Sequence, residues 1–164
     1  MRMVPVLFNF QILNHRYALL NLLGKGKDLD AVLKATPVLP EREARIIMVQ
    51  IFQGLVSLNK RTQKIIHYDL KPGNVLIDEF GVAKVTDFGL SKIVEDDVGS
   101  QGMELTSQGA VDVWSAGILF YQMLFGKRPF GHDQTQERIL REDTIIKARK
   151  VEFPSRPAVS NEAN

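Results

Sequence analysis

The chain has 164 residues, of which 45% are hydrophobic and 24% are charged, and its formal net charge is +2. This size and composition suit one soluble globular domain that can bury a core. The small net charge gives no case for nucleic-acid or membrane binding, and the lack of cysteine excludes disulfides and thiolate zinc sites. No apolar run reaches the roughly 18 residues that a membrane span needs. No small-residue cleavage site follows the apolar N-terminus, so we expect neither a transmembrane segment nor a signal peptide.

The first part of the chain predicts one strand and two helices. Residues 17–23 (YALLNLL) have the composition of a strand, which residues 24–26 (GKG) end. Asp28 is placed to cap a short helix, DLDAVLK, and a longer helix is expected over residues 41–58, directly after Pro40. The longer helix has apolar residues at spacings of three and four, which predicts one face turned toward a core. These residues are Ala44, Ile47, Ile51, Leu55 and Leu58.

The second part predicts a β-hairpin and one buried helix. The hairpin covers residues 75–86, with its turn at residues 78–81. Residues 89–111 are rich in glycine, serine, glutamine and acids, so we expect a mobile loop there. Residues 112–125 (DVWSAGILFYQMLF) are apolar on nearly every side, which predicts a buried helix. The tail after Arg149 is interrupted by prolines and is expected to be weakly structured.

The hairpin explains a cluster of polar residues in the segment IIHYDLKPGNVLIDEFGVAKVTDFGLSK (65–92). Asn74 leads into the first strand and Asp87 follows the second, so the hairpin returns both to the same end, roughly 7 Å apart. Two oxygen ligands that face one point suit Mg²⁺, which shares such ligands with substrate phosphates. Asp69 is placed to accept a proton from an attacking hydroxyl, and Lys71 to neutralise charge on a transferring phosphoryl group.

These residues resemble the catalytic loop of protein kinases, H-R-D-L-x-x-x-N, and the D-F-G triplet that follows it. The matching segments read HYDLKPGN (67–74) and DFG (87–89), and the D-L-K-P form resembles serine/threonine rather than tyrosine kinases. A chance match of a surface loop and an acidic turn is a poor alternative, because two motifs stand in the right order at the right distance. The resemblance implies ATP and Mg²⁺ as cofactors. The catalytic residues would be Asp69, Lys71 and Asn74, and the metal ligands Asn74 and Asp87, with Asp87 also part of the cofactor site.

Further segments, such as NFQILNHRY, DFGLSK, GMELTSQGA and GKRPFGH, are similar to the tousled-like serine/threonine protein kinases. The chain is identified as a member of that group, internally deleted and truncated. The implied fold is α+β and protein-kinase-like: mostly the helical C-lobe with the catalytic-loop β-hairpin, and an N-lobe reduced to about one strand. Residues 1–26 would be the N-lobe remnant, with the first strand and the start of the Gly-rich loop. Residues 27–164 would be a partial C-lobe that lacks the A-P-E segment and the C-terminal helices.

Three residues around the catalytic loop have further expected roles. The resemblance implies that Asp112 supports the backbone of the loop from the start of the buried helix. Tyr68 stands where kinases usually have an arginine that pairs with a phosphorylated activation loop, so the resemblance does not imply ordering of that kind here. His67 is expected to be a packed, hydrogen-bonded structural residue rather than a general base.

The nucleotide-binding half of the kinase pattern is incomplete. Of the Gly-rich loop G-x-G-x-x-G-x-V, only Gly24 and Gly26 remain, and Leu23 just before them completes the set expected to contact ATP. The strand lysine of V-A-I-K and its glutamate partner have no counterpart, because Lys34 falls in the predicted short helix. No A-P-E segment follows D-F-G either. One internal deletion is therefore expected for the missing lysine and glutamate, and a second for the missing A-P-E segment. They would lie at residues 26–27 and 110–111.

Two classes of function remain open. The resemblance implies a serine/threonine protein kinase that transfers the γ-phosphoryl group of ATP to protein substrates. Its activity is expected to be impaired, because the lysine–glutamate pair is needed along with the metal. The alternative is a non-catalytic kinase-like interaction fragment, or an unstable product of splicing or of a faulty gene model. The resemblance also implies a nuclear location, and no direct nucleic-acid binding or membrane contact is expected.

Overall fold

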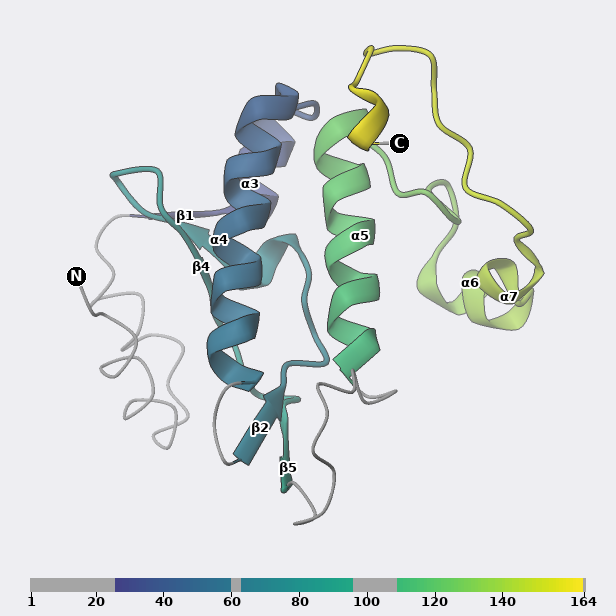
Figure 1. Cartoon of the computed structure of the whole chain (residues 1–164). Helices are drawn as coiled ribbons and strands as arrows, with labels where there is room; N and C mark the ends of the chain where they lie inside the picture. The colour runs from purple at the N-terminus through teal and green to yellow at the C-terminus, as the bar shows by residue number, and fades with distance from the viewer. Residues whose placement is uncertain (1–25, 60–62, 96–108, 164) are drawn as a thin grey trace.

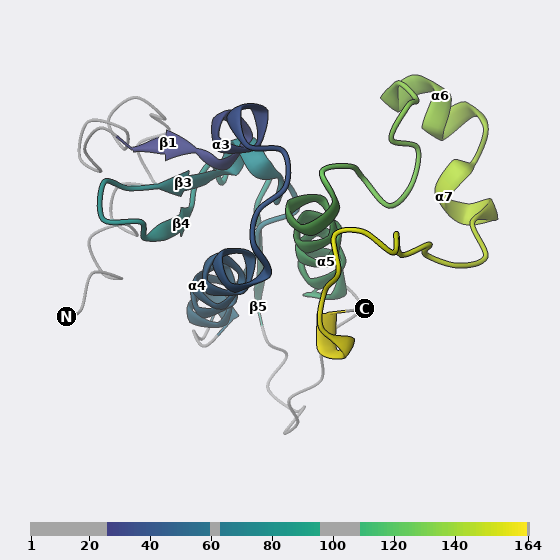
Figure 2. The same cartoon turned by 90° about the horizontal axis from the view of Figure 1, so that it is seen from above.

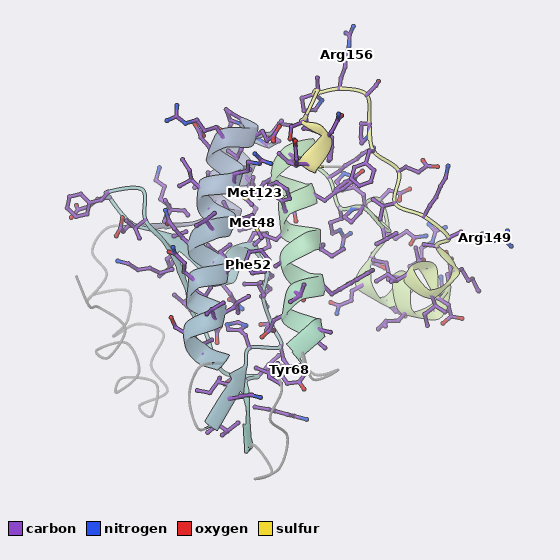
Figure 3. The ribbon with its side chains drawn as sticks, viewed as in Figure 1. Met48, Phe52, Tyr68, Met123, Arg149 and Arg156 are labelled. Atoms are coloured by element: carbon purple, nitrogen blue, oxygen red, sulfur yellow. The ribbon has the colours of Figure 1, made fainter. Side chains whose placement is uncertain are left out.

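Two long helices form the centre of the structure. A computed structural model describes residues 26–59, 63–95 and 109–163 of the chain. In it, α4 (Glu41–Asn59) and α5 (Gly109–Phe125) pack side by side, as both views show (Figure 1, Figure 2). Met48 and Met123 are buried and lie between the two helices (Figure 3). The largest fully buried side chains of this core include Leu29, Ile51, Ile66, Leu119 and Leu124.

The predicted apolar stripe of α4 is the face that meets the core. Its members Ala44, Ile51, Leu55 and Leu58 are buried, and Ile47 is half-buried against them. The helix begins directly after Pro40, whose carbonyl accepts hydrogen bonds from the backbone N–H groups of Glu43 and Ala44. A proline suits this place because its missing N–H would have no partner in the first turn.

The predicted hairpin is present and joins a three-stranded antiparallel sheet. β3 (Val75–Ile77) pairs with β4 (Ala83–Val85), and β1 (Lys27–Asp28) pairs with the other edge of β3. The Asp78 carboxylate shapes the turn by accepting the backbone N–H groups of Phe80 and Val82 and the ammonium of Lys84. Burial opposes ionisation of this carboxyl, but these bonds outweigh it and hold the pKa of Asp78 below its usual value. These bonds stabilise the turn that joins the two strands.

The expectation of a mobile loop over residues 89–111 is wrong at both ends, and its middle, residues 96–108, lies outside the described residues. β5 (Lys92–Glu95) pairs with β2 (Gln63–Ile66) in a second antiparallel sheet. α5 begins at Gly109, three residues before the expected start. Four-residue strands that are paired across almost thirty residues leave no periodic signal in the sequence, and their stability comes from the partner strand.

The short helix is capped as predicted. α3 (Leu29–Ala35) starts directly after Asp28, whose carboxylate accepts the backbone N–H of Ala31 at 2.7 Å. Lys34 lies on the exposed side of this helix and forms an i,i+4 ion pair with Asp30. This placement agrees with the assignment of Lys34 to a helix rather than to a nucleotide-binding strand.

The C-terminal part returns to the core. Two short helices, α6 (Gln136–Arg141) and α7 (Thr144–Lys147), stand to one side of α5, and the chain then runs back over it to the 3₁₀ helix η3 (Asn161–Ala163) (Figure 1). The tail has little regular structure, as expected, but it is fixed by side-chain contacts. The Tyr121 hydroxyl donates to the Glu152 carbonyl at 2.6 Å, and the rings of Tyr121 and Phe125 meet Phe153.

A second contact fixes the far end of the tail. Glu41, at the start of α4, accepts the backbone N–H of Ser160 at 2.8 Å and its hydroxyl at 2.7 Å. The side-chain and backbone hydrogen bonds of Ser160 keep the pKa of the Glu41 carboxyl below its usual value, despite some desolvation. The described part of the chain is therefore α+β, rich in helix and poor in strands, and none of its helices is long and apolar enough to cross a membrane.

Candidate active site

The loop that follows β2 is hydrogen-bonded to the first turn of α5. Asp112 is buried, and its two carboxylate oxygens accept the backbone N–H groups of His67 and Tyr68 at 2.8 and 2.9 Å. A carboxylate that accepts two buried N–H groups satisfies donors that would otherwise be costly to bury. The support that the resemblance implied for Asp112 is thus present as a pair of hydrogen bonds.

His67 is packed and fully hydrogen-bonded, as predicted. Its Nδ1 accepts the backbone N–H of Asp69 at 3.2 Å, so the ring proton lies on Nε2, which donates to the Thr86 carbonyl at 2.8 Å. The ring also meets the edge of Phe88, with 4.9 Å between the ring centroids. The histidine therefore connects the catalytic loop to the segment after β4 and has no nitrogen left for proton transfer.

Asp69, Lys71 and Asn74 meet in one cluster. The Lys71 ammonium lies 2.8 Å from Asp69 Oδ2, and Asn74 Nδ2 donates to the carbonyl and to Oδ2 of Asp69 at 2.8 and 3.0 Å. Asp69 is partly exposed and Lys71 more so, whereas Asn74 is only 1% exposed. The carboxylate is therefore held from two sides and still open to solvent.

The hairpin brings Asp87 to the same end as Asn74. Thr86 donates its backbone N–H and its hydroxyl to the Asn74 carbonyl at 2.8 and 3.2 Å, so Asn74 faces Thr86 and Asp87 is the next residue. Asp87 has a left-handed backbone, with φ of 61°, and its Oδ1 accepts the Gly89 N–H at 3.3 Å. A left-handed aspartate is uncommon and is found at constrained sites.

The donor set at this end of the hairpin fits a magnesium ion that is shared with phosphates. Because Nδ2 of Asn74 is taken up by Asp69, the amide presents Oδ1 as its remaining acceptor, and no hydrogen bond from a described residue engages it. Within the described ranges, no group of three or more His, Cys, Asp or Glu residues could hold a metal by itself. Two oxygen ligands that leave the remaining positions to phosphate and water are typical of Mg²⁺.

Of the three glycine-loop residues predicted to contact ATP, only Gly26 is described, and it does not lie in this cluster. Leu23 and Gly24, like the strand predicted over residues 17–23, lie outside the described residues. Gly26 lies against Ile77, since a Cβ added to it would come within 2.7 Å of the Ile77 carbonyl. That is the turn end of the three-residue strand β3, about 10 Å along it from Asn74. The role of Gly26 toward ATP stays a prediction.

Two residues of the site were not found from the sequence. Thr86 links Asn74 to His67 by accepting from the ring and donating to the Asn74 carbonyl. Lys92 places its ammonium over the ring of Tyr68, 5.6 Å from the centroid. Neither residue belongs to a motif that indicates such a contact. Each reaches its partner only because strand pairing brings the two segments together. The register of the hairpin could have indicated Thr86, because that residue falls opposite Asn74.

Comparison with known proteins agrees with this geometry. Residues 4–108 match the protein kinase domain family. The serine/threonine-protein kinase TOUSLED of Arabidopsis thaliana is 71% identical over 177 residues, which cover 94% of this chain and 26% of that protein. Tousled-like 1-B of Danio rerio is 48% identical over 85% of this chain and 22% of its own length, and tousled-like 1 of Caenorhabditis elegans is 45% identical over 92% and 18%.

The lengths of these alignments are informative. The chain spans about a quarter or less of the curated relatives that it matches. The alignment with the Arabidopsis protein extends over 177 residues whereas this chain has 164, so that protein has residues where this chain has none. With the catalytic-loop cluster, the hairpin and the helix support all in place, the chain belongs to the protein kinase family, in its tousled-like serine/threonine group.

Proposed function

We propose that this chain is a piece of a serine/threonine protein kinase that keeps the catalytic and metal-binding residues but transfers phosphoryl groups poorly, if at all. The observation that carries the proposal is the cluster of Asp69, Lys71 and Asn74 beside Asp87. Here a carboxylate, an ammonium and an amide oxygen surround the place where phosphoryl transfer would occur. Such transfer is catalysed mainly by positioning and electrostatic stabilisation.

Each residue has a separate role in this proposal. Asp69 orients the hydroxyl of a serine or threonine in a protein substrate and accepts its proton. Lys71 is held beside Asp69 and offsets negative charge on the transferred group. Asn74 and Asp87 would hold Mg²⁺, which when bound to ATP neutralises phosphate charge. ATP and serine- or threonine-containing proteins are thus the proposed partners, and a nuclear location follows from the resemblance alone.

The expected impairment rests on what the sequence lacks. No lysine stands in a V-A-I-K strand context, and the partner glutamate and the A-P-E segment are also missing. Kinase transfer needs the lysine–glutamate pair in place together with the metal. Each 1.36 kcal/mol of lost transition-state stabilisation lowers the rate about tenfold, so loss of this pair alone predicts a rate near background.

A transfer assay tests the proposal directly. The purified chain is incubated with radiolabelled ATP, Mg²⁺ and casein or a basic protein, with Asp69→Asn as the matched control. We expect label incorporation at background in both. Incorporation that is lost in Asp69→Asn would show an active kinase and overturn the impairment.

A binding measurement separates a poor kinase from a non-catalytic fragment. Calorimetric titration with Mg²⁺-ATP should give weak binding that weakens further in Asp87→Asn, because the hairpin offers metal ligands without most of the nucleotide site. No binding at any accessible concentration would favour the interaction fragment, and a low-micromolar dissociation constant would contradict the proposed loss of the nucleotide site.

A further inference from the structure

Tyr68 has an unusual backbone conformation directly before the proposed catalytic aspartate. Its φ is 62°, in the left-handed region that bulky residues seldom adopt. The conformation is held because Asp112 accepts the Tyr68 N–H at 2.9 Å. Strain of this kind persists only where surrounding contacts hold it in place. It sets the direction in which the chain leaves Tyr68, and thereby where Asp69 lies.

The side chain of Tyr68 makes a second contact, from the opposite side of the loop. Lys92 begins β5, and its Nζ lies over the Tyr68 ring at 5.6 Å from the centroid. Lys92 also pairs with Ile66, the last residue of β2, two residues before Tyr68. Figure 3 shows Tyr68 between the lower end of α5 and the two paired strands. The ring therefore links the loop to the sheet at the point where the sheet ends.

Charge explains why this contact matters. Among the described residues, Lys92 has no carboxylate within ion-pair distance, and the contact shown for its ammonium is the aromatic face of Tyr68. The face of a tyrosine ring carries partial negative charge and attracts a cation at this distance. An arginine at position 68 would instead place a second cation beside Lys92, and the two would need an anion between them.

We propose that Tyr68 is a positioning residue that fixes the catalytic loop to β5 through its cation–π contact with Lys92, and that this contact orders the loop without a bound anion. The inference deepens the proposed function, since it concerns the loop that carries Asp69. Only the reason for ordering the loop, to place Asp69 for catalysis, rests on the proposed function. The contact itself is tested without phosphoryl transfer or ATP.

Hydrogen exchange in the purified chain, followed by mass spectrometry, measures the ordering. A cation–π contact of this exposure corresponds to about a two- to fivefold change in the local opening equilibrium. Tyr68→Leu, which keeps the Cβ and the backbone preference but removes the ring, should speed exchange by that factor in peptides covering residues 63–69 and 92–95. Tyr68→Phe keeps the ring and should exchange as the native chain does. Peptides from α4 should not change in either variant.

A double-mutant cycle shows whether the two side chains act together. Lys92→Met alone should speed exchange as much as Tyr68→Leu, and the double variant should be no faster than either one. Lys92 is exposed, so its variant should fold even if Tyr68→Leu does not. Additive effects of the two changes, or a Tyr68→Phe variant that exchanges as fast as Tyr68→Leu, would overturn the proposal.

A charge swap tests whether the loop is ordered without an anion. Tyr68→Arg should exchange faster than the native chain in phosphate-free buffer, because two cations repel. Inorganic phosphate at constant ionic strength should slow exchange in this variant and leave the native chain unchanged. Slowing of the native chain to the same extent would show that its loop still depends on an anion. None of these outcomes depends on whether the chain transfers phosphoryl groups, so failure here is distinct from failure of the proposed function.

Discussion

The catalytic loop and the outer face of α5 are stabilised in opposite ways. Around the loop, the buried polar side chains of His67, Asn74, Thr86 and Asp112 all have partners, and no buried side-chain nitrogen or oxygen in the described ranges lacks one. On the outer face of α5, Trp114 remains 52% exposed although it stacks on Phe130. A groove of about 380 Å³ lies there, between α5, the turn after it and the tail.

This difference shows which interactions of a domain can form within one short segment of the chain. The loop network needs only residues 67–92 and a single side chain from α5, so most of its bonds join residues that are close in sequence. The apolar face of α5 cannot be completed in this way, because each exposed aromatic side chain needs a neighbouring surface to cover it. A polar network can therefore be completed within a short segment, whereas a hydrophobic face depends on distant segments that cover it.

The largest expected effect comes from removing the support of the loop. Asp112→Ala leaves one buried and one partly buried N–H group without acceptors, so we expect a loss of about 2 kcal/mol or more in the free energy of unfolding. Asp112→Asn keeps one acceptor oxygen and should lose less. Urea denaturation measures both. A loss below about 1 kcal/mol in Asp112→Ala would mean that the loop does not depend on α5.

A smaller effect is expected where the tail crosses α5. Tyr121→Phe removes the hydrogen bond to the Glu152 carbonyl and should cost about 1 kcal/mol of unfolding free energy. Tyr68→Phe is the matched control, because the Tyr68 hydroxyl has no hydrogen bond to any described residue. Thermal or urea unfolding compares the two. Equal stability in both variants would contradict a fixed tail.

The attachment of the far end of the tail should depend on acid pH. The Ser160 hydrogen bonds lower the pKa of Glu41 from 4.5, so the folded pKa is below the unfolded one. The stabilisation is therefore present above pH 4.5 and is lost as the pH falls through the lower folded value.

The NMR shift of the Ser160 amide proton follows this release directly. It should titrate below pH 4.5 in the native chain and lose most of that change in Glu41→Gln. Glu162 also has a lowered pKa, chiefly through a backbone hydrogen bond and Ser160, so Glu162→Gln serves as the background for both measurements. A titration that survives in Glu41→Gln would assign the release to another group.

The smallest effect on stability is expected on the exposed face of α5. Trp114→Gln should change the unfolding free energy little, by about 0.5 kcal/mol as for other surface substitutions. The loss of the stacking contact with Phe130 adds a small further cost. The substitution should nevertheless reduce self-association, because a large exposed apolar side chain favours it. The sedimentation coefficient of the variant should therefore rise less with protein concentration than that of the native chain. Trp114→Phe keeps an apolar ring and should sediment as the native chain does. Monomeric behaviour of the native chain at all concentrations would contradict an uncovered face.

Local features of the fold were predictable from the sequence. The stripe of α4, the cap at Asp28 and the hairpin over residues 75–86 depend on residues close in sequence, and all three are confirmed. The polar cluster of the site follows from the hairpin, because antiparallel pairing returns Asp87 to the side of Asn74.

Long-range features were not predictable. The pairing of β2 with β5 and the bond between Glu41 and Ser160, 119 residues apart, depend on surfaces that exist only once the chain is folded. α6 and α7 are only six and four residues long, too short for a clear apolar period. The cation–π contact of Tyr68 was missed for the same reason, since strand pairing places Lys92 beside it.

The shortness of the hairpin has a consequence for length variation among related sequences. β3 and β4 have three residues each, and the Asp78 turn joins them. A residue inserted in the turn would disturb the bonds of the Asp78 carboxylate, but the pairing of β3 with β4 could be kept. A residue inserted in β4 would move Asp87 by about 3.3 Å and reverse the face of every side chain after it. Insertions and deletions should therefore be tolerated between Asp78 and Val82 and be absent between Ala83 and Asp87.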